Sequence, residues 1–475
     1  MTIVMGNFGF VNPEGMIVQY STYPSGGDRL KTLKGQAVLS ALFAAITRGL
    51  GFLLRIVLGR QMGAEAMGIM EMAQGVQPLL MAPVISGLPQ AVSRLVALEG
   101  KAENAQKGQT LYAARRMALK RGTAMAVVCV AAAPFAGLLL GDMRVIPTLL
   151  LFAPALPLVG MSCVMDGCAF GMGKAFSPGV SECAEQCVRI LICLLLLGLY
   201  PRMRLPVRAA IPAFAGLLGE GAGLLVMTAA LRGIARKGCN EKAVRRNLDR
   251  MALPMMGSRL GMSGIRALTG VMLPRLLMLH GMTGGDAAAA IGRLQGMVMP
   301  LLFLPGILTG ALASLGGPQV AARTGRAQRK LMLRLFGMAL AAGIMGAGAL
   351  YLFAPVVGDV LYKQSGIAPL IQMMCPGALL AAVNHILSAM LMGLGRQRKL
   401  FFVQMTSGVI TLLLTVVLSI RFGIVGTGCA TLLGMGVQWV MLVLHIARGS
   451  FSGGCTPLAP QQGDDPPAPH SIGHS

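Results

Sequence analysis

Charged residues are scarce in this sequence and make up only 12% of its 475 residues. Soluble globular domains carry about 25% charged residues, so that class is excluded. Hydrophobic residues reach 55%. They come in runs of roughly 20, long enough to cross a hydrocarbon core of about 30 Å as helices. The composition therefore predicts a polytopic, all-α membrane protein.

Aromatic and acidic residues are also few. Aromatics make up 5%, and 17 Asp and Glu stand against 41 Lys and Arg, which gives a net charge of +24. So few aromatics argue against a base-stacking surface. Lys and Arg lie mainly in short loops between apolar runs. We therefore predict no nucleic-acid partner and interpret the basic residues as topology signals that face the cytoplasm and its anionic lipids.

Metal-binding and catalytic patterns are missing as well. Most of the ten cysteines lie inside apolar runs, and Cys183 and Cys187 share a helix face without a His or second Cys pair to complete a zinc set. The five His form no catalytic group, and no phosphate-binding loop is present. The sequence predicts no metal, no cofactor and no enzyme activity. An ion gradient or the membrane potential would then supply the energy, with H⁺ or Na⁺ as the coupling ion.

Twelve apolar runs predict about twelve transmembrane helices, six on each side of a basic linker. The basic clusters all fall on the cytoplasmic side when both termini are cytoplasmic, whereas Arg202, Arg204 and Arg208 fall outside. The expected parts are a cytoplasmic leader (1–34), an N-lobe (35–231), the basic linker (232–251), a C-lobe (252–447) and a disordered cytoplasmic tail (448–475).

The two halves repeat one another at an offset of 221 to 222 residues. Gln74 matches Gln295, Pro83 matches Pro305, and Pro154 matches Pro376. Pro83 and Pro305 are expected to bend the second and eighth predicted helices. Because each half has an even number of predicted helices, the halves are parallel repeats. Such repeats support alternating access by rocking. A channel or a structural scaffold could also be built by this duplication.

Several segments resemble the MOP (multidrug/oligosaccharidyl-lipid/polysaccharide) flippase superfamily. Residues 47–52 (TRGLGF) and 59–65 (GRQMGAE) are similar to its first helix and turn. Residues 87–96, 292–321 and 392–396 resemble its stage V sporulation protein B branch. The resemblance covers roughly residues 35–447.

This resemblance implies a V-shaped, two-lobe transporter with a central cavity in the cytoplasmic membrane. The implied cargo is a lipid-linked oligosaccharide, or a peptidoglycan or polysaccharide precursor, moved from the inner to the outer leaflet. A role in synthesis of the sporulation cell wall (cortex) is implied too. The expected partners are a lipid-linked sugar pyrophosphate and membrane lipids.

Four arginines fall inside predicted helices and are the candidate substrate-binding residues: Arg48 and Arg55 in the first helix, Arg259 and Arg266 in the seventh. Each pair is seven residues apart, two helical turns, and so shares one face. Facing lipid, the four would cost roughly 10–14 kcal/mol on insertion scales. We expect them to line a hydrated cavity and hold pyrophosphate oxygens through paired donors. The alternative is that some of them snorkel to the cytoplasmic interface.

Other intramembrane polar residues are secondary candidates. Glu220 and Asp166 could couple transport to ion or proton movement, or pair with an intramembrane Arg. Gln74 and Gln295 could line the cavity or bind helix to helix. His385 could relay protons, although a packing hydrogen bond is the simpler interpretation.

Two other functional classes stay open. One is a MATE-type multidrug or metabolite antiporter, whose organic cations a four-arginine cavity would repel. The other is a membrane enzyme or assembly partner, which would need essential groups at the outer face, where only Asp142, Asp286 and Asp359 are found.

Overall fold

The computed structural model describes residues 27–451, apart from 100–107, 175, 201, 235–240 and 365. Of these residues it describes side chains between 42 and 447, apart from 308, 311, 314, 315 and 318. Within this part of the chain every regular element is a helix and no strand occurs. Most of the predicted leader and tail lies outside the described residues. The first helix begins at Gly27, and the helix after the basic linker begins at Glu241.

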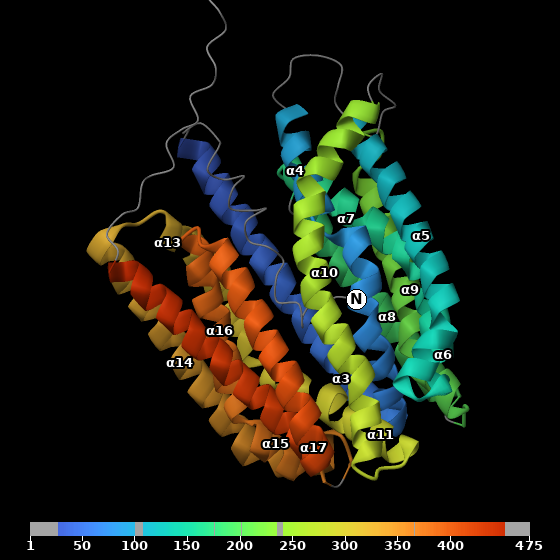
Figure 1. Cartoon of the computed structure of the whole chain (residues 1–475). Coiled ribbons are helices and arrows are strands. Elements are labelled where there is room, and N and C mark those ends of the chain that lie inside the picture. The colour runs from blue at the N-terminus through green and yellow to red at the C-terminus, as the bar shows by residue number, and fades with distance from the viewer. Residues whose placement is uncertain are drawn as a thin grey trace, which may run out of the picture.

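The N-terminal half forms one bundle of helices (Figure 1). Its elements are α3 (Gly27–Ile85), α4 (Leu88–Glu99), α5 (Gln109–Leu140), η1 (Met143–Val145), α6 (Ile146–Phe152), α7 (Ala155–Gly171), α8 (Phe176–Leu199) and α9 (Leu205–Ala230).

The C-terminal half follows the same plan. Its elements are α10 (Glu241–Leu279), α11 (Gly284–Ile291), η2 (Gly292–Val298), α12 (Met299–Leu302), α13 (Pro305–Ala321), α14 (Gly325–Val356), η3 (Val357–Leu361), α15 (Ile367–Met374), α16 (Pro376–Gly393) and α17 (Gln397–Phe451).

Two of these long helices are each a pair of helices that meet at one glycine. Gly63 in α3 has φ 79° and Gly423 in α17 has φ 58°, both in the left-handed region that a residue without Cβ adopts easily. The resemblance predicts a turn within residues 59–65. The second helix of α3 starts directly after Gly63, so a single residue makes this turn.

The second and eighth predicted helices are broken near prolines, as expected. The helix α3 ends at Ile85 and α4 starts at Leu88, after Gly87 in the left-handed region. In the second half α12 ends at Leu302 and α13 starts at Pro305. Proline removes a backbone donor and clashes with the preceding turn, so a helix breaks there.

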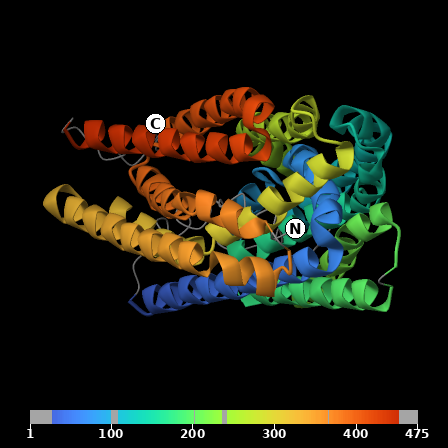
Figure 2. The same ribbon diagram turned by 90° about the horizontal axis from the view of Figure 1, so that it is seen from below.

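The two bundles lie side by side, converge at one end and diverge at the other (Figure 1). Seen from below, the orange and red helices gather on one side and the cyan and green ones on the other (Figure 2). This arrangement confirms the predicted two-lobe fold. The diverging end carries the basic starts of α5, α10 and α14 (Figure 1) and is the end predicted to be cytoplasmic.

The helix α10 follows the first half along its length. A Cβ at Gly270 would lie 3.2 Å from Cα of Gly75, so the two backbones almost touch. Nearer its start, Arg121 of α5 donates to Asp249 at 2.5 Å. On its other side, α10 packs against α17, where a Cβ at Gly408 would lie 3.5 Å from Ile265. The seventh predicted helix therefore bridges both bundles.

At the converging end the lobes meet through small residues. A Cβ at Gly68 would overlap the carbonyl oxygen of Ala288, and one at Gly292 would overlap that of Ala64. Tyr362 is fully buried beside Gly59. Residues spaced by four, such as Ala64 with Gly68 and Ala288 with Gly292, let helix backbones approach closely.

Seven helices of the described part are long and apolar enough to cross a membrane, or eight if the pair Met143–Phe152 and Ala155–Gly171, bent by 42°, counts as one span. Both α3 and α17 enter this count once, although each contains two helices. Large apolar side chains such as Leu225 and Leu352 are exposed on the outside, as lipid contact requires. The chain is a multi-pass membrane protein; the number twelve stays a prediction.

Candidate substrate site between the two bundles

Arg48 and Arg55 lie on the inner face of the first helix of α3. Leu42, Ile46 and Leu53 are exposed on its opposite face. Arg48 and Arg55, seven residues apart, share the face of buried residues. Arg48 is nevertheless half-buried rather than buried. Its accessible surface therefore opens to the interior of the protein and not to lipid.

Arg55 is held inside the N-terminal bundle. Only 3% exposed, it forms an ion pair with Glu71 and donates to Oε1 of Gln74 at 3.1 Å. Both partners belong to the second helix of α3. The two arginines of the predicted pair therefore have different surroundings. Arg48 faces the space between the bundles, whereas Arg55 is bound to Glu71 and Gln74 inside the N-terminal bundle. Gln74 joins the two helices of α3.

Arg259 and Arg266 share the inner face of α10. They stand four residues before and three residues after the buried Ser263, so the three are neighbours on one face. Leu268 is exposed on the opposite face. Arg266 is exposed although it lies at the centre of the buried face, and Arg259 is half-buried. Contact with lipid does not explain this exposure, because both arginines lie on the face opposite Leu268.

Glu182 of α8 faces the same space and was missed at the sequence level. It stands three, four and seven residues before Glu185, Gln186 and Arg189, all buried, yet Glu182 is only half-buried. It interacts electrostatically with Arg48 and lies beside the Thr47 hydroxyl. The polar spacing of three, four and seven inside an apolar helix is the signal that could have found it.

The C-terminal bundle meets Arg48 at Gly310 of α13. A Cβ at Gly310 would overlap Nη1 of Arg48 and would lie 3.5 Å from Cε1 of His385 on α16. The His385 ring nitrogen Nδ1 is 3.4 Å from the Thr309 hydroxyl. Arg48 therefore reaches across from the first half to polar groups of the second half, and His385 makes a helix-to-helix contact.

Asp166 and Arg259 complete the polar wall. Asp166 of α7 is half-buried and interacts electrostatically with Glu182 and Glu185. Arg259 lies near Cys163, one helical turn before Asp166. The structure thus brings Arg48, Arg259, Asp166 and the unpredicted Glu182 to neighbouring inner faces.

Glu220 belongs to a separate polar cavity inside the N-terminal bundle. The cavity has a volume of about 70 Å³ and is lined on its polar side by Arg55, Gln74, Gln77, Thr148, Arg189 and Glu220. Glu220 is buried and hydrogen-bonded to Glu185, which pairs with Arg189. Gln295 is half-buried in η2, a π-helical turn at the contact between the bundles.

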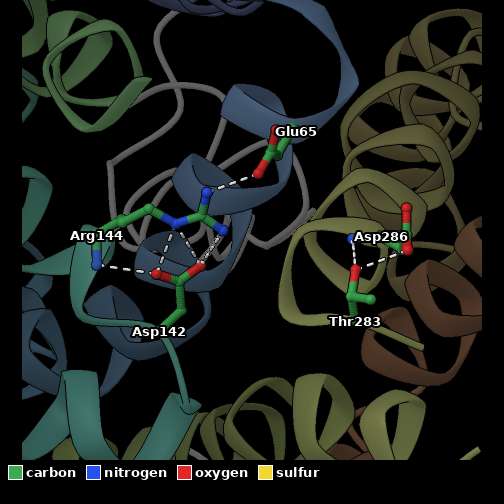
Figure 3. A network of polar contacts seen from close by, with 5 residues as sticks. All are labelled: Glu65, Asp142, Arg144, Thr283 and Asp286. Carbon is green, nitrogen blue, oxygen red and sulfur yellow. Dashed lines mark hydrogen bonds and ion pairs between the residues drawn. The ribbon is translucent and has the colours of Figure 1, made fainter. Parts of the chain in front are cut away.

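The converging end carries a polar network (Figure 3). Arg144 donates to both carboxylate oxygens of Asp142 and to Glu65 at 2.6 Å. Beside them, Thr283 caps α11 by accepting from the Asp286 amide. Asp142 and Asp286 are both engaged in local hydrogen bonds, and Asp359 is exposed in η3.

Comparison with known proteins gives concordant results. The profile of a family described as "polysaccharide biosynthesis protein" matches residues 33–315. Stage V sporulation protein B of Bacillus subtilis (strain 168) is 26% identical over 440 residues, which cover 88% of this chain and 83% of that protein.

Two solved structures share the fold. An inward-facing multidrug resistance MATE family transporter of the MOP superfamily has a TM-score of 0.67 at 15% identity, over 88% of this chain and 100% of that one. The lipid II flippase MurJ in an inward closed conformation has a TM-score of 0.67 at 11% identity, over 86% and 87%. The resemblance to the MOP superfamily is confirmed.

Proposed function

This chain belongs to the polysaccharide biosynthesis protein family, and we propose that it is a flippase for a lipid-linked oligosaccharide or cell-wall precursor. It would carry the sugar pyrophosphate from the inner to the outer leaflet of the cytoplasmic membrane while the lipid tail stays in the bilayer. The proposal makes it a transporter and not an enzyme.

The observation that carries this proposal is the set of arginines on inward helix faces. Arg48, Arg259 and Arg266 lie opposite the lipid-exposed leucines of their helices and still retain accessible surface. Guanidinium groups bind phosphate oxygens through paired donors and stay charged throughout a transport cycle. We assign the pyrophosphate to these three residues. Arg55 is assigned a structural role, because its ion pair with Glu71 joins the two helices of α3.

The side from which the substrate enters follows from which end of the two bundles is open. Close backbone contacts seal the converging end at Gly68 and Gly292, whereas the bundles diverge at the basic end (Figure 1). With both termini in the cytoplasm, this is the state that accepts substrate from the inner leaflet. Rocking of the two repeats about their contact would expose the site to the outer leaflet.

Energy coupling is assigned to the carboxylates of the first half. Glu220 lines the cavity inside the N-terminal bundle, and Asp166 lies near the substrate site. Either can take up H⁺ or Na⁺, as intramembrane carboxylates often do. Because the curated relative is a sporulation protein, the proposed role is supply of precursor for the spore cortex.

Reconstitution tests the function. The purified protein is placed in liposomes with a fluorescent lipid-linked sugar pyrophosphate, and leaflet exchange is followed with a membrane-impermeant quencher. Replacement of Arg48 and Arg266 together by Gln should abolish exchange, whereas replacement of the exposed Arg232 should not. Full exchange by the double variant at normal expression would refute the arginine site.

A MATE-type antiporter is the second candidate, because carboxylates stand beside the arginines. Asp166 and Glu182 on the inner wall could attract an organic cation. Transport of a lipophilic cation by the same liposomes, without exchange of the lipid-linked sugar, would decide for this function.

A further inference from the structure

We propose that Glu182 is the internal counter-anion of Arg48, and that the phosphate group of the substrate displaces it. This inference rests on the proposed function and adds a residue that sets the affinity of the site. The sequence alone does not connect the two residues, since 134 positions separate them.

Glu182 faces inward for a geometric reason. In an α-helix, residues three, four and seven apart lie on one side. Glu185, Gln186 and Arg189 stand at these spacings from Glu182 and are buried, whereas Leu191 is exposed to lipid on the opposite side. The remaining accessible surface of Glu182 therefore opens to the space that Arg48 also faces.

Arg48 has Glu182 as its anionic neighbour because α3 and α8 pack together at this level. A Cβ at Gly179, one helical turn before Glu182, would overlap the ring of Phe43, and the rings of Phe43 and Phe176 are 5.6 Å apart. Within the described part of the chain, Arg48 makes no hydrogen bond and no ion pair shorter than 4.0 Å, and its attractive electrostatic contact is with Glu182. Both nitrogens of the guanidinium fork thus remain able to donate to a ligand. An arginine that was locked in a bidentate pair, as Arg144 is with Asp142, would be a poor receptor for phosphate.

The groups around Glu182 leave Arg48 as its main compensating charge. Thr47 on α3 lies beside it, while Glu185 on its own helix and Asp166 on α7 are of like charge. Glu185 is itself paired with Arg189. On the far side of Arg48, His385 and Gly310 belong to the other bundle.

A substrate phosphate entering between Arg48 and the second bundle therefore competes with Glu182 for one cation. A pyrophosphate that carries one negative charge on each phosphate and accepts two parallel hydrogen bonds from a guanidinium outcompetes a carboxylate held at longer range. The carboxylate keeps the empty site compensated and weakens substrate binding, which favours release. Removing its charge should tighten binding.

The test measures binding of inorganic pyrophosphate to the purified full-length protein by titration calorimetry. E182Q should lower the Kd roughly three- to fivefold, the range for a partly exposed ion pair. E182D should behave like the wild type. The matched control is E241Q, which removes a carboxylate that pairs with Arg116 at the surface, and should leave the Kd unchanged.

A double-mutant cycle separates this role from a structural one. If Glu182 acts through Arg48, E182Q should have no effect on the Kd in an R48Q background. An equal effect in both backgrounds, or no effect of E182Q in the wild type while R48Q weakens binding, would overturn the counter-anion role and leave the proposed function standing. No pyrophosphate binding by any variant, wild type included, would instead refute the anion site of the proposed function.

Discussion

The contact at the converging end sets the balance between conformations, and Gly292 is the residue at which to test this. A Cβ at Gly292 would lie 2.7 Å from the backbone nitrogen of Gly68 and would overlap the carbonyl oxygen of Ala64. These are backbone atoms, which cannot turn aside as a side-chain end can. Bringing the contact with Gly68 alone from 2.7 Å to the ordinary 3.4 Å requires about 0.7 Å of separation, and the closer Ala64 oxygen requires more.

The size of the effect follows from overpacking. Adding a methyl group to such a contact costs about 1–3 kcal/mol. A state in which the bundles part at this end does not contain the contact. G292A should therefore shift the equilibrium toward that state by about 5- to 150-fold.

The assay is a distance measurement by electron spin resonance across the converging end. Spin labels are attached at Met143 of the first half and Asp359 of the second, both exposed, after the ten native cysteines have been replaced. G292A should add a population with a longer distance. The matched control is G284A, because Gly284 starts the preceding helix and has no atom within 4 Å of its Cβ position.

An unchanged distance distribution in G292A would refute the reasoning, provided that the variant is folded. So would an equal change in G284A, because both replacements raise helix propensity by a similar amount. Only a change confined to Gly292 supports a role of backbone contact in keeping this end closed.

Two further perturbations test the interior. R55M should destabilise the protein by about 3–5 kcal/mol because it leaves the carboxylate of Glu71 buried without its partner. A double variant that also carries E71L should regain most of the thermal unfolding midpoint in detergent, and R60M at an exposed position should leave the midpoint unchanged. Equal midpoints for the single and double variants would contradict the pairing. G310A should lower the rate of lipid flipping about tenfold or more, because the new Cβ takes the place of the Arg48 guanidinium. G306A is the control, because the space at its Cβ position is open. Equal flipping rates for the two glycine variants would argue against the assigned position of Arg48.

Sequence reasoning predicted the elements of the repeat well. The breaks near Pro83 and Pro305 were predicted because proline perturbs its own helix, whatever lies around it. A turn within residues 59–65 was predicted from the resemblance, but Gly63 was not singled out, because a single left-handed glycine carries no pattern that differs from the many other glycines of the chain.

At the candidate site, too, local features were predicted and contacts between helices were not. A spacing of seven placed Arg48 and Arg55 on one face, because helical periodicity is a local property. That Arg55 is paired with Glu71 while Arg48 reaches Gly310 depends on how helices pack. Glu182 was overlooked because its significance comes from Arg48, a residue on another helix.

The sequence by itself determined the membrane class, the duplication, the broken helices and the faces on which the arginines lie. These follow from hydropathy, repeat spacing and helical period, all of which act within one segment. Only the tertiary structure decided which arginine faces the space between the bundles, which carboxylate accompanies it, and which end is closed. Those features depend on contacts between segments far apart in the chain. Which neighbouring helix an arginine meets decides whether it forms a buried ion pair, as Arg55 does, or keeps an accessible charge, as Arg48 does.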